Sequence, residues 1–206
     1  MKRAPAVAWA AALALFVWLA FDVPRGETWF DEPFRTWVHA HAMPAATTLM
    51  IWFSRIGQPL VLVIAAAIIC LVLWRVGHSR TATEFAIVIA GAEFIDLGVK
   101  NAVRRIRPMP FYGRRPMTYS FPSGHALMSC AFFGCLAVIA AARFKSRAHR
   151  WICYSAAILC AGAIGLSRIY LGVHYPSDVL GGYAAAVVWA GTVAFVFHQL
   201  RTAPHT

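Results

Sequence analysis

The sequence predicts an all-α fold, an integral-membrane bundle of six transmembrane helices with a short interfacial helix after the first span. The first observation is composition, because 60% of the 206 residues are hydrophobic and 13% are charged, against about 45–50% and about 25% in soluble domains. The second is that five strongly apolar runs of 17 to 27 residues contain no Asp, Glu, Lys or Arg. Each run gives roughly 25 Å or more of helix, which suits a hydrocarbon core of about 30 Å.

The six spans can be placed by these runs and by the residues that interrupt them. The first, which follows Lys2 and Arg3, is interpreted as a retained helix, since its uncharged stretch exceeds the about 7–15 residues of a signal peptide. The third contains acidic residues, and acids within a span usually face the bundle interior. The fourth starts at Ser123, a good N-cap that follows Pro122. We expect spans at 4–22, 56–75, 82–100, 123–142, 151–167 and 177–200.

The segment 22–55 is too polar to span but contains apolar residues at helical spacing, namely Phe30, Phe34, Trp37, Val38 and His41. This pattern predicts a short amphipathic helix at the outer interface. Packing of its apolar stripe against the bundle is favoured over a lipid-access gate. With no internal repeat or low-complexity linker, residues 1–206 are expected to form one membrane-embedded domain.

The net charge of +11 would by itself suggest a nucleic-acid partner, but the apolar content argues for the bilayer instead. Nine basic residues fall on the side of the N-terminus and ten on the other. Six of those ten lie within 100–115 and Arg168 is a seventh; if they serve an anion site, the remaining bias is nine against three. The positive-inside rule then predicts cytoplasmic termini and an outward-facing site.

Two short segments with catalytic potential lie near the middle of the chain. Lys100 is followed after six residues by Arg107 and Pro108, a pattern that taken alone also suits interfacial anchors. The segment 121–125, Phe-Pro-Ser-Gly-His, places the Ser123 hydroxyl, flexible Gly124 and the His125 imidazole where a helix begins. Unpaired backbone N–H groups at that end suit a phosphate, although an N-cap with a satisfied histidine would look the same.

A third segment runs from Ser167 and Arg168 to His174 and Asp178. The last two are four residues apart around Pro176, which suits the first turn of a helix. The carboxylate can accept a hydrogen bond from the ring and leave the other ring nitrogen available for attack. A capping interaction is the alternative for this pair considered alone.

The predicted helix order places all three segments on one side of the membrane. Three cations, two histidines, a carboxylate and a helix N-terminus then converge. This set suits phosphoryl transfer without metal, in which cations hold the non-bridging oxygens, one histidine attacks phosphorus and the other protonates the leaving oxygen. The loops lack carboxylate clusters suited to Mg²⁺ or Zn²⁺, so no metal or cofactor is expected. The five cysteines all lie in apolar stretches and are interpreted as small buried hydrophobic residues.

The three segments together resemble the signature motifs of the type 2 phosphatidic acid phosphatases, whose fold is shared with vanadium-dependent haloperoxidases. The resemblance implies that His174 is the nucleophile that becomes phosphohistidine, Asp178 its orienting partner, and His125 the acid and later the base. It implies phosphate binding by Lys100, Arg107, Ser123, Gly124 and Arg168. It also implies a lipid phosphate or diphosphate substrate, such as undecaprenyl diphosphate, phosphatidylglycerophosphate, phosphatidate or lipid A.

Several further charged residues lie close to the three motifs. Family members often carry a second Arg-Pro where this chain has Arg105-Ile106, a departure that leaves Lys100 and Arg107 intact. Glu93 and Asp96 share a helical face with Lys100 and are expected to orient its ammonium group without contacting the substrate themselves. The alternative is that they neutralise neighbouring arginines. Arg114 and Arg115 are expected to bind a second phosphate, which favours undecaprenyl diphosphate, or else to anchor the loop to the membrane.

Other functions use some of the same features. A lipid phosphotransferase would share every motif, and an anion transporter would use the basic loop as a filter but would not need the spacing of His174 and Asp178. A haloperoxidase would be soluble. The expected partners are the bilayer and a lipid phosphate, with no nucleic acid and no obligate protein partner evident. The sequence does not identify the lipid, the oligomeric state or the role of residues 22–55.

Overall fold

The computed structural model describes residues 3–202, and every regular element in this range is helical, as predicted. Lys2, one of the basic residues counted for the orientation, lies outside the described residues. The elements are α1 Arg3–Asp22, a 3-10 turn at Val23–Arg25, α2 Asp31–Ala40, α3 Pro44–Ile56, α4 Pro59–Arg75, α5 Ser79–Val103, α6 Gly124–Ala141, α7 Arg147–Tyr170 and α8 Pro176–Thr202.

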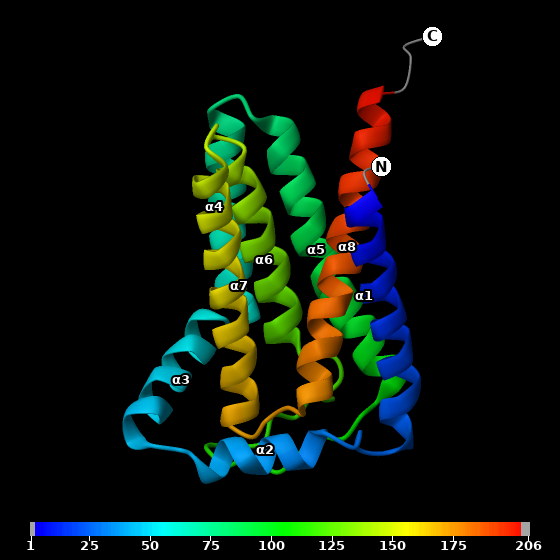
Figure 1. The fold of residues 1–206 in the computed structure, drawn as a ribbon, viewed down its shortest axis with the longest axis vertical. Helices are drawn as coiled ribbons and strands as arrows, with labels where there is room; N and C mark the ends of the chain where they lie inside the picture. Colours follow the sequence, from blue (N-terminus) through cyan, green and yellow to red (C-terminus); the bar gives the residue numbers. More distant parts are fainter. Residues whose placement is uncertain (1–2, 203–206) are drawn as a thin grey trace.

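The long helices run side by side, and α2 lies across one end of them (Figure 1). Helix α6 is central, because it packs against α4, α5, α7 and α8. Many residues of α6 are buried, whereas α1 has few buried residues and packs along α8 at the edge of the bundle. The core is built around Phe85 of α5 and Leu127, Met128 and Phe132 of α6.

Four described helices, α1, α6, α7 and α8, are long and apolar enough to cross a membrane. Helices α3 and α4 meet the same criteria only as a pair, bent by 50° at a short break, which brings the number of candidate spans to five. The predicted helix at 82–100 forms as α5, but its charged residues keep it outside this group. The short helix predicted within 22–55 forms as α2. A second helix that was not predicted, α3, follows it and starts with Pro44 at its first helical position.

Helix α2 forms where an amphipathic helix was predicted, but only part of its apolar stripe, Phe30 and Val38, packs against the bundle. Its buried residues are Asp31, Arg35 and Val38, whereas Phe34 and Trp37 are 42% and 58% exposed. The predicted packing of the apolar stripe against the bundle is therefore wrong for these two rings. The apolar face of an amphipathic helix is usually the buried one. Here the bundle surface that α2 meets is polar, so charged side chains of α2 can be buried against it with partners.

Candidate active site

The three polar segments meet at the end of the bundle that α2 crosses (Figure 1). The first begins in the last turn of α5 and continues into the following loop, the second starts α6, and the third joins the end of α7 to the start of α8. Together they carry the eight residues predicted to act on phosphate, Lys100, Arg107, Ser123, Gly124, His125, Arg168, His174 and Asp178.

Close packing of α6 on α8 joins the second and third segments. The Ser123 N–H donates to the Asp178 carbonyl over 2.9 Å. One turn further along α8, a Cβ on Gly182 would lie 2.7 Å from the Ser123 carbonyl oxygen. Only glycine allows this approach, so Gly182 sets the distance between the two helix starts.

His174 is fixed at both ring nitrogens. Its Nδ1 lies 3.3 Å from Oδ2 of Asp178, and its Nε2 lies 2.7 Å from Nη1 of Arg107. Because the carboxylate only accepts and the guanidinium only donates, the proton belongs on Nδ1 and the lone pair on Nε2. Burial, together with the nearby charge of Arg107, lowers the pKa of His174 to about 3 although its contact with Asp178 opposes the shift. The ring is therefore neutral at physiological pH, as a nitrogen nucleophile must be.

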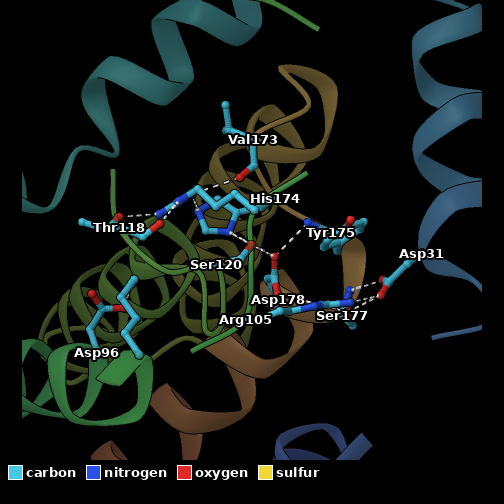
Figure 2. A network of polar contacts seen from close by, with 12 residues as sticks. Asp31, Asp96, Arg105, Thr118, Ser120, Val173, His174, Tyr175, Ser177 and Asp178 are labelled. Atoms are coloured by element: carbon cyan, nitrogen blue, oxygen red, sulfur yellow. Dashed lines mark hydrogen bonds and ion pairs between the residues drawn. The ribbon is translucent and has the colours of Figure 1, made fainter. Parts of the chain in front are cut away.

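The carboxylate of Asp178 is surrounded by donors (Figure 2). Oδ2 accepts from the Tyr175 N–H at 2.9 Å, from the Ser120 hydroxyl and from His174. Oδ1 accepts from Nη1 of Arg105 at 2.7 Å. The side chain has no exposed surface, so these donors replace water in stabilising its charge.

Arg107 crosses the site on the Nε2 side of His174. Nε and Nη2 donate to the carbonyl and hydroxyl of Thr118 at 2.7 and 2.9 Å, and Nη1 also donates to the Val173 carbonyl at 3.0 Å. Burial lowers the pKa of Arg107 from its usual value, against the opposing effect of the charge of Asp178. A cation held away from water in this way is available to bind an anion.

Lys100 is paired with Asp96, four residues earlier on α5, as predicted from the spacing. The carboxylate of Asp96 also packs against Gly124, because a Cβ at that glycine would lie 3.0 Å from both of its oxygens. Glu93 has no hydrogen bond or ion pair within residues 3–202. The structure therefore connects Asp96 to the site, but not Glu93.

Two buried polar atoms of the site have no hydrogen-bond partner within the described part of the chain, Oγ of Ser123 and Nε of Arg168. Ser123 occupies the N-cap position of α6 as predicted, but its hydroxyl makes no capping hydrogen bond. Nη1 of Arg168 donates to the Ser54 hydroxyl of α3. Unpartnered buried donors are costly, and an oxyanion bound between them would satisfy both. His125 follows in the first turn of α6, half-buried.

Arg114 and Arg115 lie in the exposed part of the loop between the first two segments. Arg115 turns back and donates to the Arg107 carbonyl, whereas no contact of Arg114 is recorded within residues 3–202. One member of the pair therefore lies beside the loop that carries Arg107. The described residues contain no group of three His, Cys, Asp or Glu side chains placed to hold a metal.

Sequence reasoning missed several residues that hold the site together. Thr118 binds Arg107 and Ser120 binds Asp178, both from the loop between the first two segments. Their position in that loop was the only feature of the sequence that could have indicated these contacts. Arg105 was noted only as a departure from a family pattern, yet it binds Asp178 directly. Asp31 is 146 residues from its contact Ser177, and nothing in the local sequence indicated that pairing.

Comparisons with known proteins identify the family of the chain. The family model of the PAP2 superfamily matches residues 81–202. The chain is 33% identical over 92 residues to phosphatidylglycerophosphatase B of Bacillus subtilis, covering 44% of this chain and 45% of that protein. It is 29% identical over 146 residues to undecaprenyl-diphosphatase BcrC of the same organism, covering 67% and 70%. The chain thus spans less than half the length of the first relative and just over two thirds of the second.

A solved structure shares the fold. The crystal structure of a transmembrane PAP2-type phosphatidylglycerolphosphate phosphatase from Bacillus subtilis superposes with a TM-score of 0.83 at 21% identity. The superposition covers 95% of this chain and 98% of that one.

Proposed function

The chain belongs to the PAP2 superfamily of membrane lipid phosphatases, and from that premise we propose that it hydrolyses a phosphate or diphosphate ester of a membrane lipid through a phosphohistidine on His174. The observation that carries the proposal is the state of that ring. A carboxylate holds Nδ1, and the lone pair of Nε2 faces the cation of Arg107. A phosphoryl group that takes the place of this hydrogen bond would meet the nucleophile at phosphorus and the cation at its oxygens.

In the proposed reaction, Nε2 of His174 attacks phosphorus and the bond from phosphorus to the leaving oxygen breaks. His125 gives that oxygen a proton, and Asp178 stabilises the ring as it becomes positive. Water then attacks the phosphohistidine, His125 takes up a proton from the water, and phosphate leaves with the original imidazole restored. Lys100, Arg107 and Arg168 neutralise the charge that builds on the equatorial oxygens.

The experiment that tests the function is release of inorganic phosphate by the purified protein from a panel of lipid mono- and diphosphates. We expect release that is unchanged by EDTA, because Lys and Arg supply the positive charge, and inhibition by vanadate, which imitates five-coordinate phosphorus. No release from any lipid would favour an anion transporter. Transfer of phosphate to an added acceptor lipid in place of water would favour the phosphotransferase.

The favoured substrate is a diphosphate such as undecaprenyl diphosphate, and the support for it is the position of Arg115 beside the Arg107 loop. Lys100, Arg107 and Arg168 are enough to bind one phosphate. The further pair, Arg114 and Arg115, would therefore bind a second phosphate. The double variant Arg114→Gln/Arg115→Gln should lose about 10-fold or more in kcat/KM on undecaprenyl diphosphate, as charge-assisted hydrogen bonds are worth about 1.5–3 kcal/mol. Phosphatidate turnover is the matched control. Equal losses on both lipids would identify the arginines as membrane anchors.

The proposed topology has six spans, with the bent pair α3 and α4 as one and α5 as another. Helix α5 is 25 residues long, and two of its three acids have partners, since Glu84 binds Arg80 and Arg201 and Asp96 binds Lys100. Paired acids reduce the cost of placing this helix in lipid. Six spans place both termini on the same side of the membrane, and the chain is then one domain. The bias of basic residues toward the termini makes that side the cytoplasm and places the site outside.

Cysteine labelling tests this topology. A cysteine in place of Met117, which is fully exposed between the first two motifs, should react with a membrane-impermeant thiol reagent added to intact cells. A cysteine in place of Ser146, exposed before α7 at the other end, should react only after the cells are opened. Wild type, whose five cysteines are all partly buried, provides the background. The reverse pattern would place the active site in the cytoplasm.

A further inference from the structure

The surface that α2 turns toward the bundle is charged, and it lies against the residues that hold the candidate nucleophile. Asp31 has no exposed surface and Arg35 is 6% exposed. A buried carboxylate is stabilised only where donors surround it. The contacts of Asp31 therefore show what this helix does at the end of the bundle.

Asp31 binds two separate parts of the site (Figure 2). Its Oδ1 accepts from the Ser177 N–H at 2.9 Å, and its Oδ2 accepts from the Ser177 hydroxyl at 2.7 Å and from Nη2 of Arg105 at 2.7 Å. The Thr28 N–H, at the turn before α2, donates to Oδ2 at 3.1 Å. One carboxylate thus joins α2, the first turn of α8 and the loop after α5.

Arg105 carries this connection to Asp178. Its Nη2 donates to Asp31 and its Nη1 donates to Oδ1 of Asp178, both at 2.7 Å. The guanidinium lies over the Tyr175 ring, 4.2 Å from its centroid. Burial alone would lower the pKa of Arg105, but the charges of Asp178 and Asp31 outweigh it and raise the pKa. Because the guanidinium is rigid and planar, it holds the two carboxylates in a fixed relation.

The orientation of Asp178 matters because its contact with His174 is the longest of its hydrogen bonds, at 3.3 Å. Within the described residues Arg105 is the only donor recorded for Oδ1, while the other donors share Oδ2. A small rotation of the carboxylate would therefore break the contact with His174 first. Without that acceptor, only the donor Nη1 of Arg107 still favours the lone pair on Nε2. A larger fraction of the rings then carries the proton on Nε2, where it removes the lone pair that attacks phosphorus.

We propose that Asp31 is a positioning residue for phosphoryl transfer, acting through Arg105 to hold Asp178 in the orientation that keeps Nε2 of His174 unprotonated. The proposal rests on the function proposed above. It gives the interfacial helix α2 a role in catalysis, since its first residue, Asp31, is connected to His174 through the side chains of Arg105 and Asp178. The rings on its outer face take no part in this connection.

The variant Asp31→Asn keeps the size of the side chain and removes its charge. With phosphatidate in detergent micelles as the probe, kcat should fall about 10–100-fold, the usual range for residues that orient a reactive group from behind. KM should stay within about threefold, because Lys100, Arg107 and Arg168 are unchanged. The matched control is Glu32→Gln, which breaks an ion pair with Arg35 in the same helix and should leave kcat within about twofold.

A second variant separates positioning from general stability. Arg105→Lys keeps a positive charge that can reach only one of the two carboxylates, so kcat should again fall with KM retained. The double variant Asp31→Asn/Arg105→Lys should be no slower than Arg105→Lys alone, because both changes interrupt one chain. Even if Asp31→Asn does not fold, a wild-type kcat in folded Arg105→Lys would overturn the inference.

The inference is overturned if Asp31→Asn or Arg105→Lys folds with wild-type kcat, if KM rises while kcat is kept, or if the two losses multiply. These results differ from a failure of the proposed function, which would appear as no phosphate release by wild type or full activity in His174→Ala. Active wild type and inactive His174→Ala with a normal Asp31→Asn would remove the role of Asp31 and leave the function intact.

Discussion

His174→Ala is expected to lower phosphate release from phosphatidate by on the order of 10⁴-fold or more, because it removes the group that forms the covalent intermediate. The ring is 1% exposed and held at both nitrogens, by Asp178 on one side and Arg107 on the other. Burial, opposed only in part by Asp178, lowers its pKa to about 3, so protonation does not compete with attack at neutral pH. Each part of this geometry is lost with the imidazole.

The measurement has two parts. Phosphate release gives the loss of turnover, and brief exposure to lipid labelled in its phosphate should leave acid-labile label on wild type but not on the variant. The conservative variant His174→Asn, with its thermal unfolding midpoint measured in parallel, separates lost chemistry from lost folding. Substantial turnover or label in folded His174→Ala would exclude this residue as the nucleophile.

His125→Ala is expected to lower lipid phosphate turnover by about 10²–10⁴-fold, the usual contribution of a general acid. The residue lies in the first turn of α6, next to the unpartnered Ser123 hydroxyl and within electrostatic reach of Arg168 and His174. Its proposed proton goes to the leaving oxygen. A leaving group that is already a stable anion needs no such proton, so the loss should depend on the substrate.

An aryl phosphate with an acidic phenol tests this dependence. His125→Ala should lose much less activity on that substrate than on phosphatidate, whose alkoxide leaves poorly. His149→Ala is the matched control, because that exposed histidine begins α7 at the opposite end of the bundle, and it should behave as wild type on both. The same loss on both substrates would assign His125 to binding rather than to proton transfer.

The long helices could be predicted closely because the bilayer leaves few alternatives. Spans expected at 123–142 and 177–200 form as Gly124–Ala141 and Pro176–Thr202, since an apolar run in lipid must satisfy its own backbone as a helix. The residue types of the three motifs likewise predicted which side chains meet at one end. Local patterns were weaker between the first two long helices, where α3 had no distinct signal.

What the sequence determined by itself was the set of helices and the chemistry of the residues at their ends, because hydropathy, helix-start residues and charge act over a few neighbouring positions. The arrangement of those residues depended on contacts between distant segments. Gly182 sets the separation of the two helix starts, and Arg105 lies between Asp178 and Asp31 rather than facing lipid headgroups. The burial of α2 by its charged face has the same cause. Which face of a helix is buried depends on the partner surface, and here that surface is polar, so only the folded chain could decide it.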